Sequence, residues 1–98
     1  MIALDNYVID VLMRDLVGHD RSPASFLVYL WFAAEHARHK RAIEVSYNDL
    51  AEHIGISKSS AQAAVAWLLR RKLLERSKDH VTATPRYRVL SPWRGRES

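Results

Sequence analysis

The sequence has no cysteine, and its 98 residues include only three glycines and three prolines. Without cysteine the chain has no disulfide, no thiolate metal ligand and no cysteine nucleophile. It has no apolar run near the ~20 residues that span a bilayer, and its first residues lack the basic start and apolar middle of a signal peptide. Glycine-rich phosphate loops and serine-triad signatures are also missing. These absences predict a cytoplasmic protein with no enzymatic activity, no cofactor, no membrane contact and no small-molecule ligand.

The positive charge lies in the second part of the chain. Residues 1–35 carry two basic and five acidic side chains, a net charge of −3. Residues 36–98 carry 13 basic and 6 acidic side chains, a net charge of +7, and ten of those bases lie between Lys58 and Arg96. The hydrophobic fraction of 48% supports one domain with its own core. A basic second part favours a polyanionic partner.

Two helices are expected before residue 40. Apolar residues at three- and four-residue spacing predict a helix over residues 5–17: Tyr7, Val8, Val11, Leu12 and Leu16. Gly18 follows in the position of a C-terminal glycine. Ser22 and Pro23 are typical of an N-cap followed by proline in the first turn, and they predict a helix over residues 23–39. Its expected buried residues are Phe26, Leu27, Leu30, Trp31 and Ala34.

Shorter elements follow. Residues 43–45 alternate and predict a short strand. Ser46 is expected to cap a helix over residues 47–54, with Asp49 in the capping-box position, and Gly55 to end it. Ser57 is expected to cap a helix over residues 58–72. Residues 73–77 and 86–90 predict a hairpin whose loop is 78–85. The predicted fold is α+β and mainly helical, in the order α-α-β-α-α-β-β.

The stretch from Leu50 to Ala61 resembles a helix-turn-helix. A small residue, Ala51, lies where two helices would cross, and Gly55 supplies the left-handed residue of the turn. With the hairpin added, residues 22–90 resemble a winged helix-turn-helix, as in MarR- and GntR-like bacterial regulators and the N-terminal domains of phage or plasmid replication initiators. This implies one winged domain over residues 1–92, with scaffold helices 5–17 and 23–39, helix-turn-helix 46–72 and wing 73–90. A basic tail, 93–98, follows.

The resemblance implies a double-stranded DNA-binding protein, a small bacterial or phage transcriptional regulator that inserts its second helix into the major groove. The implied base contacts are Lys58, Ser59, Ser60, Gln62 and Ala63. The implied phosphate contacts are Ser57, Arg70, Arg71, Arg76, Lys78, Arg86, Arg88 and Arg41. Arg86 and Arg88 are expected to share the solvent face of an edge strand.

The sequence departs from the family pattern at two places. Lys72 occupies a position where winged-helix proteins usually have glycine, so a strained or rearranged helix exit is expected. Alanine stands at 63 and 66, in the middle of the recognition helix, which predicts a shallow sequence preference.

Two alternative functions stay open: a protein–protein interaction module and the DNA-binding domain of a replication initiator. His36 and His39 have metal-pair spacing, but without a third ligand nearby we expect a surface pair.

A homodimer is expected, because palindromic DNA sites need two-fold proteins. One candidate surface is the first helix, and the other is Trp67 with help from Trp93 in the tail. The first-helix residues in question are Tyr7, Val8, Val11 and Met13. The alternative for Trp67 is packing under the wing or against the first helix.

Overall fold

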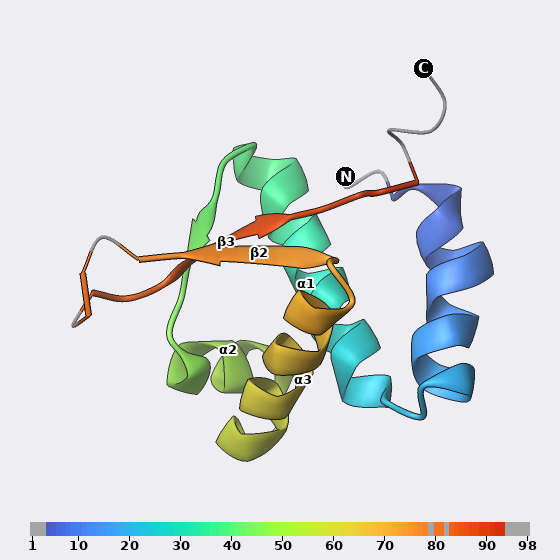
Figure 1. The fold of residues 1–98 in the computed structure, drawn as a ribbon, viewed down its shortest axis with the longest axis horizontal. Helices are drawn as coiled ribbons and strands as arrows, with labels where there is room; N and C mark the ends of the chain where they lie inside the picture. Colours follow the sequence, from blue (N-terminus) through green and yellow to red (C-terminus); the bar gives the residue numbers. More distant parts are fainter. Residues whose placement is uncertain (1–3, 79, 82, 94–98) are drawn as a thin grey trace.

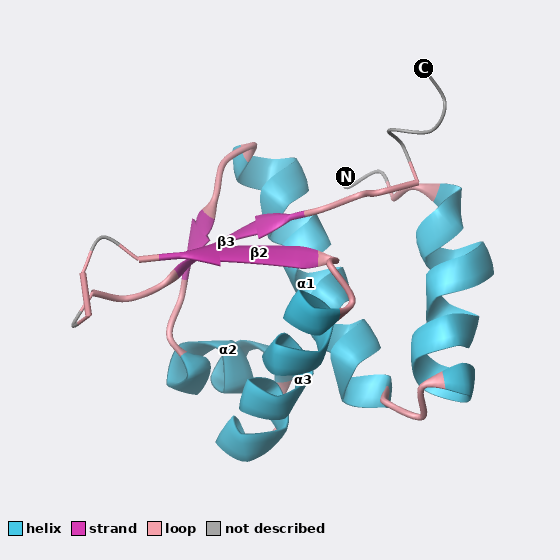
Figure 2. Ribbon diagram, viewed as in Figure 1, coloured by secondary structure: helices cyan, strands magenta, loops and turns pink. Residues whose placement is uncertain are grey.

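The computed structural model of the chain describes residues 4–78, 80, 81 and 83–93. Over these residues the fold is α+β and mostly helical, as predicted, with four helices beside a three-stranded antiparallel sheet (Figures 1 and 2). The elements in chain order are η1 (Val8–Leu12), η2 (Arg14–His19), α1 (Pro23–His39), β1 (Ile43–Glu44), α2 (Tyr47–Ile54), α3 (Lys58–Arg70), β2 (Leu74–Ser77) and β3 (Arg86–Val89). Apart from Trp93, the predicted tail lies outside the described residues.

The first helix, residues 6–19, is wound mainly as a π-helix and comprises η1 and η2. Its i→i+5 hydrogen bonds include Met13 N–H to the Val8 carbonyl, and the Asp20 N–H continues the pattern to Asp15 at 2.7 Å. The predicted glycine ending is wrong, since Gly18 lies inside η2 without a positive φ. The bond to Asp20 closes the last wide turn, and the chain reverses one residue later, at Arg21 with φ 54°.

Helix α1 is the centre of the fold and contacts η2, α3, α2 and the sheet. Ser22 precedes it as predicted, with Pro23 in the first turn, although the Ser22 hydroxyl bonds to the Ser25 hydroxyl at 2.5 Å and makes no backbone cap bond. Its buried side chains are Ser25, Phe26, Val28, Tyr29 and Phe32. The prediction that Leu27 is buried is wrong, since it is 44% exposed. The buried face of α1 is the side that packs against α3 and the sheet.

Helices α2 and α3 are joined by a tight turn with the predicted local chemistry. The Ser46 hydroxyl accepts the Asp49 N–H at 3.1 Å, and the Ser57 hydroxyl accepts the Ser60 N–H at 3.1 Å. Gly55 ends α2 in the left-handed conformation, with φ 90°. The two helices pack through Leu50 and Ala51 of α2 and the buried side of α3. That buried side consists of Ala61, Ala64, Val65 and Leu68.

Helix α3 ends at Arg70, two residues before the predicted end. Lys72 takes φ 60°, so the expected strained exit is present. The Lys72 N–H bonds to the Leu69 carbonyl at 3.1 Å, and the Leu73 N–H bonds to the Leu68 carbonyl at 2.9 Å. This is the bonding pattern of a Schellman motif, whose left-handed residue is usually glycine.

The sheet has the strand order β1-β3-β2, so β3 is the central strand. The prediction that Arg86 and Arg88 lie on an edge strand is therefore wrong. Strand β1 pairs with the second side of β3, and β1 is too short for its sequence to indicate this pairing. Tyr87 stands opposite both Ile43 and Arg76. Its buried ring lies 5.1 Å from that of Phe32 in α1, which joins the sheet to the helical core.

Candidate nucleic-acid interface

Helix α3 presents one exposed face along its whole length. Four of the predicted base-contact residues are on it: Lys58, Ser59, Gln62 and Ala63. The face continues through Ala66 to Arg70. It begins at the capped N-terminus, where free backbone N–H groups and the helix dipole favour an anion. Its centre is flat because alanine side chains are short, so another surface can approach the helix backbone closely.

The three predicted hydroxyl contacts hydrogen-bond to one another within the cap. The Ser57 hydroxyl contacts the Ser60 hydroxyl at 2.8 Å and the Ser59 hydroxyl at 3.3 Å. Ser60 is half-buried, whereas Ser59 is exposed. The structure therefore leaves Ser59, next to Lys58, as the more accessible of the two predicted serine base contacts.

Three basic residues gather at the C-terminal end of α3. The Arg70 guanidinium lies over the Trp67 ring, 5.4 Å from its centroid. The Arg71 Nε lies 3.4 Å from the Asp20 carboxylate, and its side chain remains 38% exposed. Lys72 is exposed. The arrangement keeps Arg70 and Lys72 turned to solvent while Arg71 partly neutralises a buried acid.

Trp67 is half-buried, and it contacts the residue that follows the first helix. Its indole N–H donates to the Asp20 carboxylate at 3.0 Å, and that carboxylate is only 5% exposed. Burial raises the pKa of Asp20, but hydrogen bonds from Trp67 and His19 and the charge of Arg71 outweigh it, so the pKa is lowered overall. An open hollow of about 350 Å³ lies beside this contact, lined by Asp20, Ser22, Ala24, Ser60, Ala63, Ala64 and Trp67.

The strand register places the wing arginines on opposite faces of the sheet. Arg76 pairs with Tyr87 on the face turned to the helices, and its guanidinium donates to the Tyr47 hydroxyl of α2 at 3.1 Å. Burial, together with the neighbouring Tyr47, raises the pKa of Tyr87. Arg86 and Arg88 lie on the outer face, where Arg88 forms an ion pair with Glu75. A shallow hollow there is lined by Ala42, Glu75, Ser77, Arg86 and Arg88.

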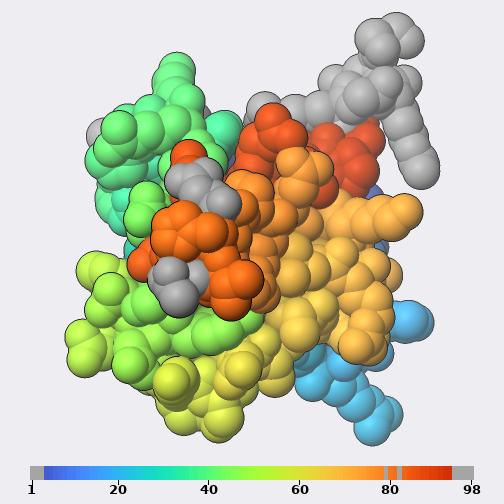
Figure 3. Space-filling view, turned by 60° about the vertical axis from the view of Figure 1, so that its left-hand side comes forward, coloured from blue at the N-terminus to red at the C-terminus, as the bar shows by residue number. Residues whose placement is uncertain are grey.

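Six of the eight predicted phosphate contacts fall into two groups. The α3 side holds Ser57, Arg70, Arg71 and Arg76. Figure 3 shows the hairpin (orange) lying against α2 (green) and next to α3 (yellow) on one continuous surface. The outer side holds Arg86 and Arg88. Arg41, which precedes β1, instead lines a separate groove together with Glu35 of α1. Lys78 lies past the end of β2, where its ammonium donates to the Val81 carbonyl at 3.4 Å.

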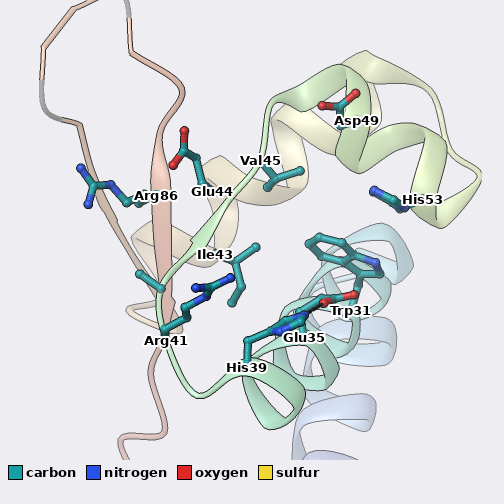
Figure 4. A pocket seen from close by; sticks show the side chains of 11 residues that line it. Trp31, Glu35, His39, Arg41, Ile43, Glu44, Val45, Asp49, His53 and Arg86 are labelled. Carbon is teal, nitrogen blue, oxygen red and sulfur yellow. Dashed lines mark ion pairs between the residues drawn. The ribbon is translucent and has the colours of Figure 1, made fainter.

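A groove between α1, β1 and α2 was not predicted from the sequence (Figure 4). Its volume is about 730 Å³, and the rings of Trp31 and His53 stack in it at 5.3 Å. Glu35 pairs with Arg38 and His39, each at 3.1 Å. The one available signal was the four-residue spacing of Trp31, Glu35 and His39 on a single face of α1. Among the described residues no three His, Asp or Glu side chains form a group that could hold a metal ion.

The predicted dimer residues of the first helix are mostly used within the chain. Val8 is buried, so its side chain does not reach the surface. Tyr7 stacks on Trp93, with ring centroids 4.4 Å apart and planes at 13°. The Trp93 indole N–H donates to Asp5 at 2.9 Å. Trp93 therefore packs at the start of the first helix, where it covers Tyr7.

Comparison of the chain with protein families, characterised proteins and solved structures finds no significant match. Across the part of the chain that the structure describes, every helix is too short or too polar to cross a membrane.

Proposed function

We propose that the chain is a winged helix-turn-helix protein that binds double-stranded DNA, acting as a small bacterial or phage transcriptional regulator. The observation that carries the proposal is the exposed face of α3, which starts at a capped N-terminus with Lys58 and Ser59 and ends at Arg70. A major groove admits one α-helix, and Lys, Ser and Gln side chains pair with base edges there. Ala63 and Ala66 keep the centre of this face low enough for close approach.

Arg76 supports the same orientation. It stands on the helix-side face of the sheet, beside the first residue of α2, so a backbone that follows α3 would pass within its reach. Arg70 and Lys72 would hold the backbone at the other end of α3. Phosphate contacts position a protein without reading sequence. The mechanism would be occupation of a promoter, with affinity drawn mainly from charge and a shallow sequence preference.

The test is binding of a fluorescent random-sequence duplex at low salt, followed by anisotropy. Wild type is expected to bind, and Lys58→Ala and Arg70→Ala are each expected to weaken binding roughly tenfold. Arg38→Ala is the matched control, since Arg38 is an exposed cation at the far end of α1. Absence of binding by wild type at low salt, or an equal loss in all three variants, would refute the proposal.

A protein–protein interaction module is the second candidate, and one observation favours it. Ala63, Ala66 and Trp67 form an apolar strip on α3 beside the hollow that Asp20 lines. In that case substitution of Lys58 would leave binding to the partner protein intact, and the chain would not bind duplex DNA.

A replication-initiator domain would bind DNA with the same surface. Selection of bound sequences from a random pool would distinguish it from a transcriptional regulator, because an initiator would enrich origin-type repeats.

A further inference from the structure

Three large apolar side chains form a stripe on the outer side of the first helix. Ile9, Met13 and Val17 are each separated by four residues and are 43%, 41% and 38% exposed. The neighbouring stripe, Val8, Leu12 and Leu16, is buried in the core. The helix thus has two apolar faces, and the packing within the chain covers only one of them.

The π winding keeps residues four apart on one side of the helix. A turn closed by i→i+5 bonds holds more residues than the about 3.6 of an α-helix, so side chains four apart drift less around the axis. The first helix also lies at the edge of the molecule, with α1 on one side and, among the described residues, no other element beyond it (Figure 1). A stripe of this kind on an outer helix costs free energy while it faces water.

The charges beside the stripe are self-complementary. Asp10 and Arg14 are both exposed and follow Ile9 and Met13 by one position, so they flank the stripe on the same side. Neither has an ion-pair partner among the described residues. Two such helices packed antiparallel about Met13 would bring Ile9 beside Val17 of the other copy and Asp10 within reach of Arg14 of the other copy. A two-fold axis makes each of these contacts twice. Parallel packing would put the charges on opposite sides.

We propose that this face, Ile9, Met13 and Val17 with Asp10 and Arg14, is the interface of an antiparallel homodimer. The occupant is a second copy of this chain, since the acid and the base that flank the stripe match each other across a two-fold axis. The dimer does not depend on DNA, so it is measured without DNA. Its failure would leave the proposed DNA binding standing.

The first experiment is sedimentation velocity at a series of protein concentrations. Wild type is expected to approach twice its 11.3 kDa mass at submillimolar concentration and to dissociate on dilution. Met13→Asp is expected to raise the dimer dissociation constant more than tenfold. Val81→Asp, which changes an exposed valine of the hairpin loop, is expected to leave it unchanged. A monomeric wild type, or a Met13→Asp variant that dimerises as well as wild type, would overturn the proposal.

The second experiment tests the antiparallel charge pairing with surface substitutions. Asp10→Arg and Arg14→Asp should each dimerise several-fold more weakly, because each homodimer then faces like charges twice. An equimolar mixture of the two variants should restore the dimer, since every contact in the mixed pair joins opposite charges. Circular dichroism confirms that both variants are folded. A mixture that associates no better than its separate components would refute the antiparallel interface.

Discussion

Two tryptophan–aspartate hydrogen bonds hold the ends of the first helix. The Trp93 indole donates to Asp5 at its start, and the Trp67 indole donates to Asp20 at its end. A buried indole N–H without an acceptor costs free energy, so each tryptophan needs its carboxylate. These bonds join residues 88 and 47 positions apart, and they attach the π-helix to the chain's C-terminal part and to α3.

Asp20→Asn tests the charge at one of these ends. Because the pKa of Asp20 is lowered in the folded state, its charge stabilises the fold fully above the ordinary aspartate pKa of about 3.9, and this contribution is lost as the pH falls through the folded-state pKa. The variant is expected to lower the free energy of unfolding by about 1 kcal/mol near neutral pH. Urea denaturation should show this difference shrinking below about pH 4.

The control is Glu52→Gln, which makes the same acid-to-amide change at an exposed position of α2. It is expected to lower stability less than Asp20→Asn at neutral pH. The contrary result is a difference in free energy of unfolding between wild type and Asp20→Asn that stays the same from neutral to acid pH. That result would show that Trp67 and Arg71 do not stabilise the charge of the Asp20 carboxylate.

At the scale of elements, the helix exit at Lys72 carries identifiable strain. A lysine at φ 60° brings its Cβ close to the following carbonyl, a conflict that glycine avoids. Lys72→Gly is expected to raise the free energy of unfolding by about 1 kcal/mol. Lys72→Ala removes the same charge but keeps the Cβ, so it should change stability little. Equal stability of the two variants in chemical denaturation would show that backbone strain at this position is negligible.

Local chemistry made several elements predictable from the sequence. The caps at Ser46 and Ser57 and the turn at Gly55 depend on residues within four positions of each other, and the structure has all three. The end of the first helix was not predictable from Gly18, because the π winding continues through this residue to His19. The Asp20–Trp67 bond and the pairing of β1 with β3 join distant residues, and nothing in the local pattern indicates them.

At the scale of the whole molecule, the basic residues that the structure describes in the second half of the chain do not form one surface. The sequence places Arg76, Arg86 and Arg88 in one wing, but the strand register sends Arg76 toward the helices and the other two outward. The outer face also carries Glu44 and Glu75, which reduce its positive potential. Alternation along a strand predicts which residues share a face of the sheet. It does not predict which of the two faces meets the helices, because that depends on the packing of Tyr87.

This division determines how each arginine should affect the salt dependence of DNA binding. If the duplex lies along α3 as proposed, Arg76 contacts a phosphate and the outer pair does not. Each phosphate contact contributes about 0.9 to the slope of log K against log salt concentration. Arg76→Ala should therefore reduce the magnitude of the slope by about 0.9, measured by anisotropy over a potassium chloride series. Arg86→Ala and Arg88→Ala are the matched controls on the neighbouring strand and should leave the slope unchanged. The reverse result, with the outer arginines lowering the slope and Arg76 having no effect, would place the DNA on the other side of the sheet and remove α3 from the major groove.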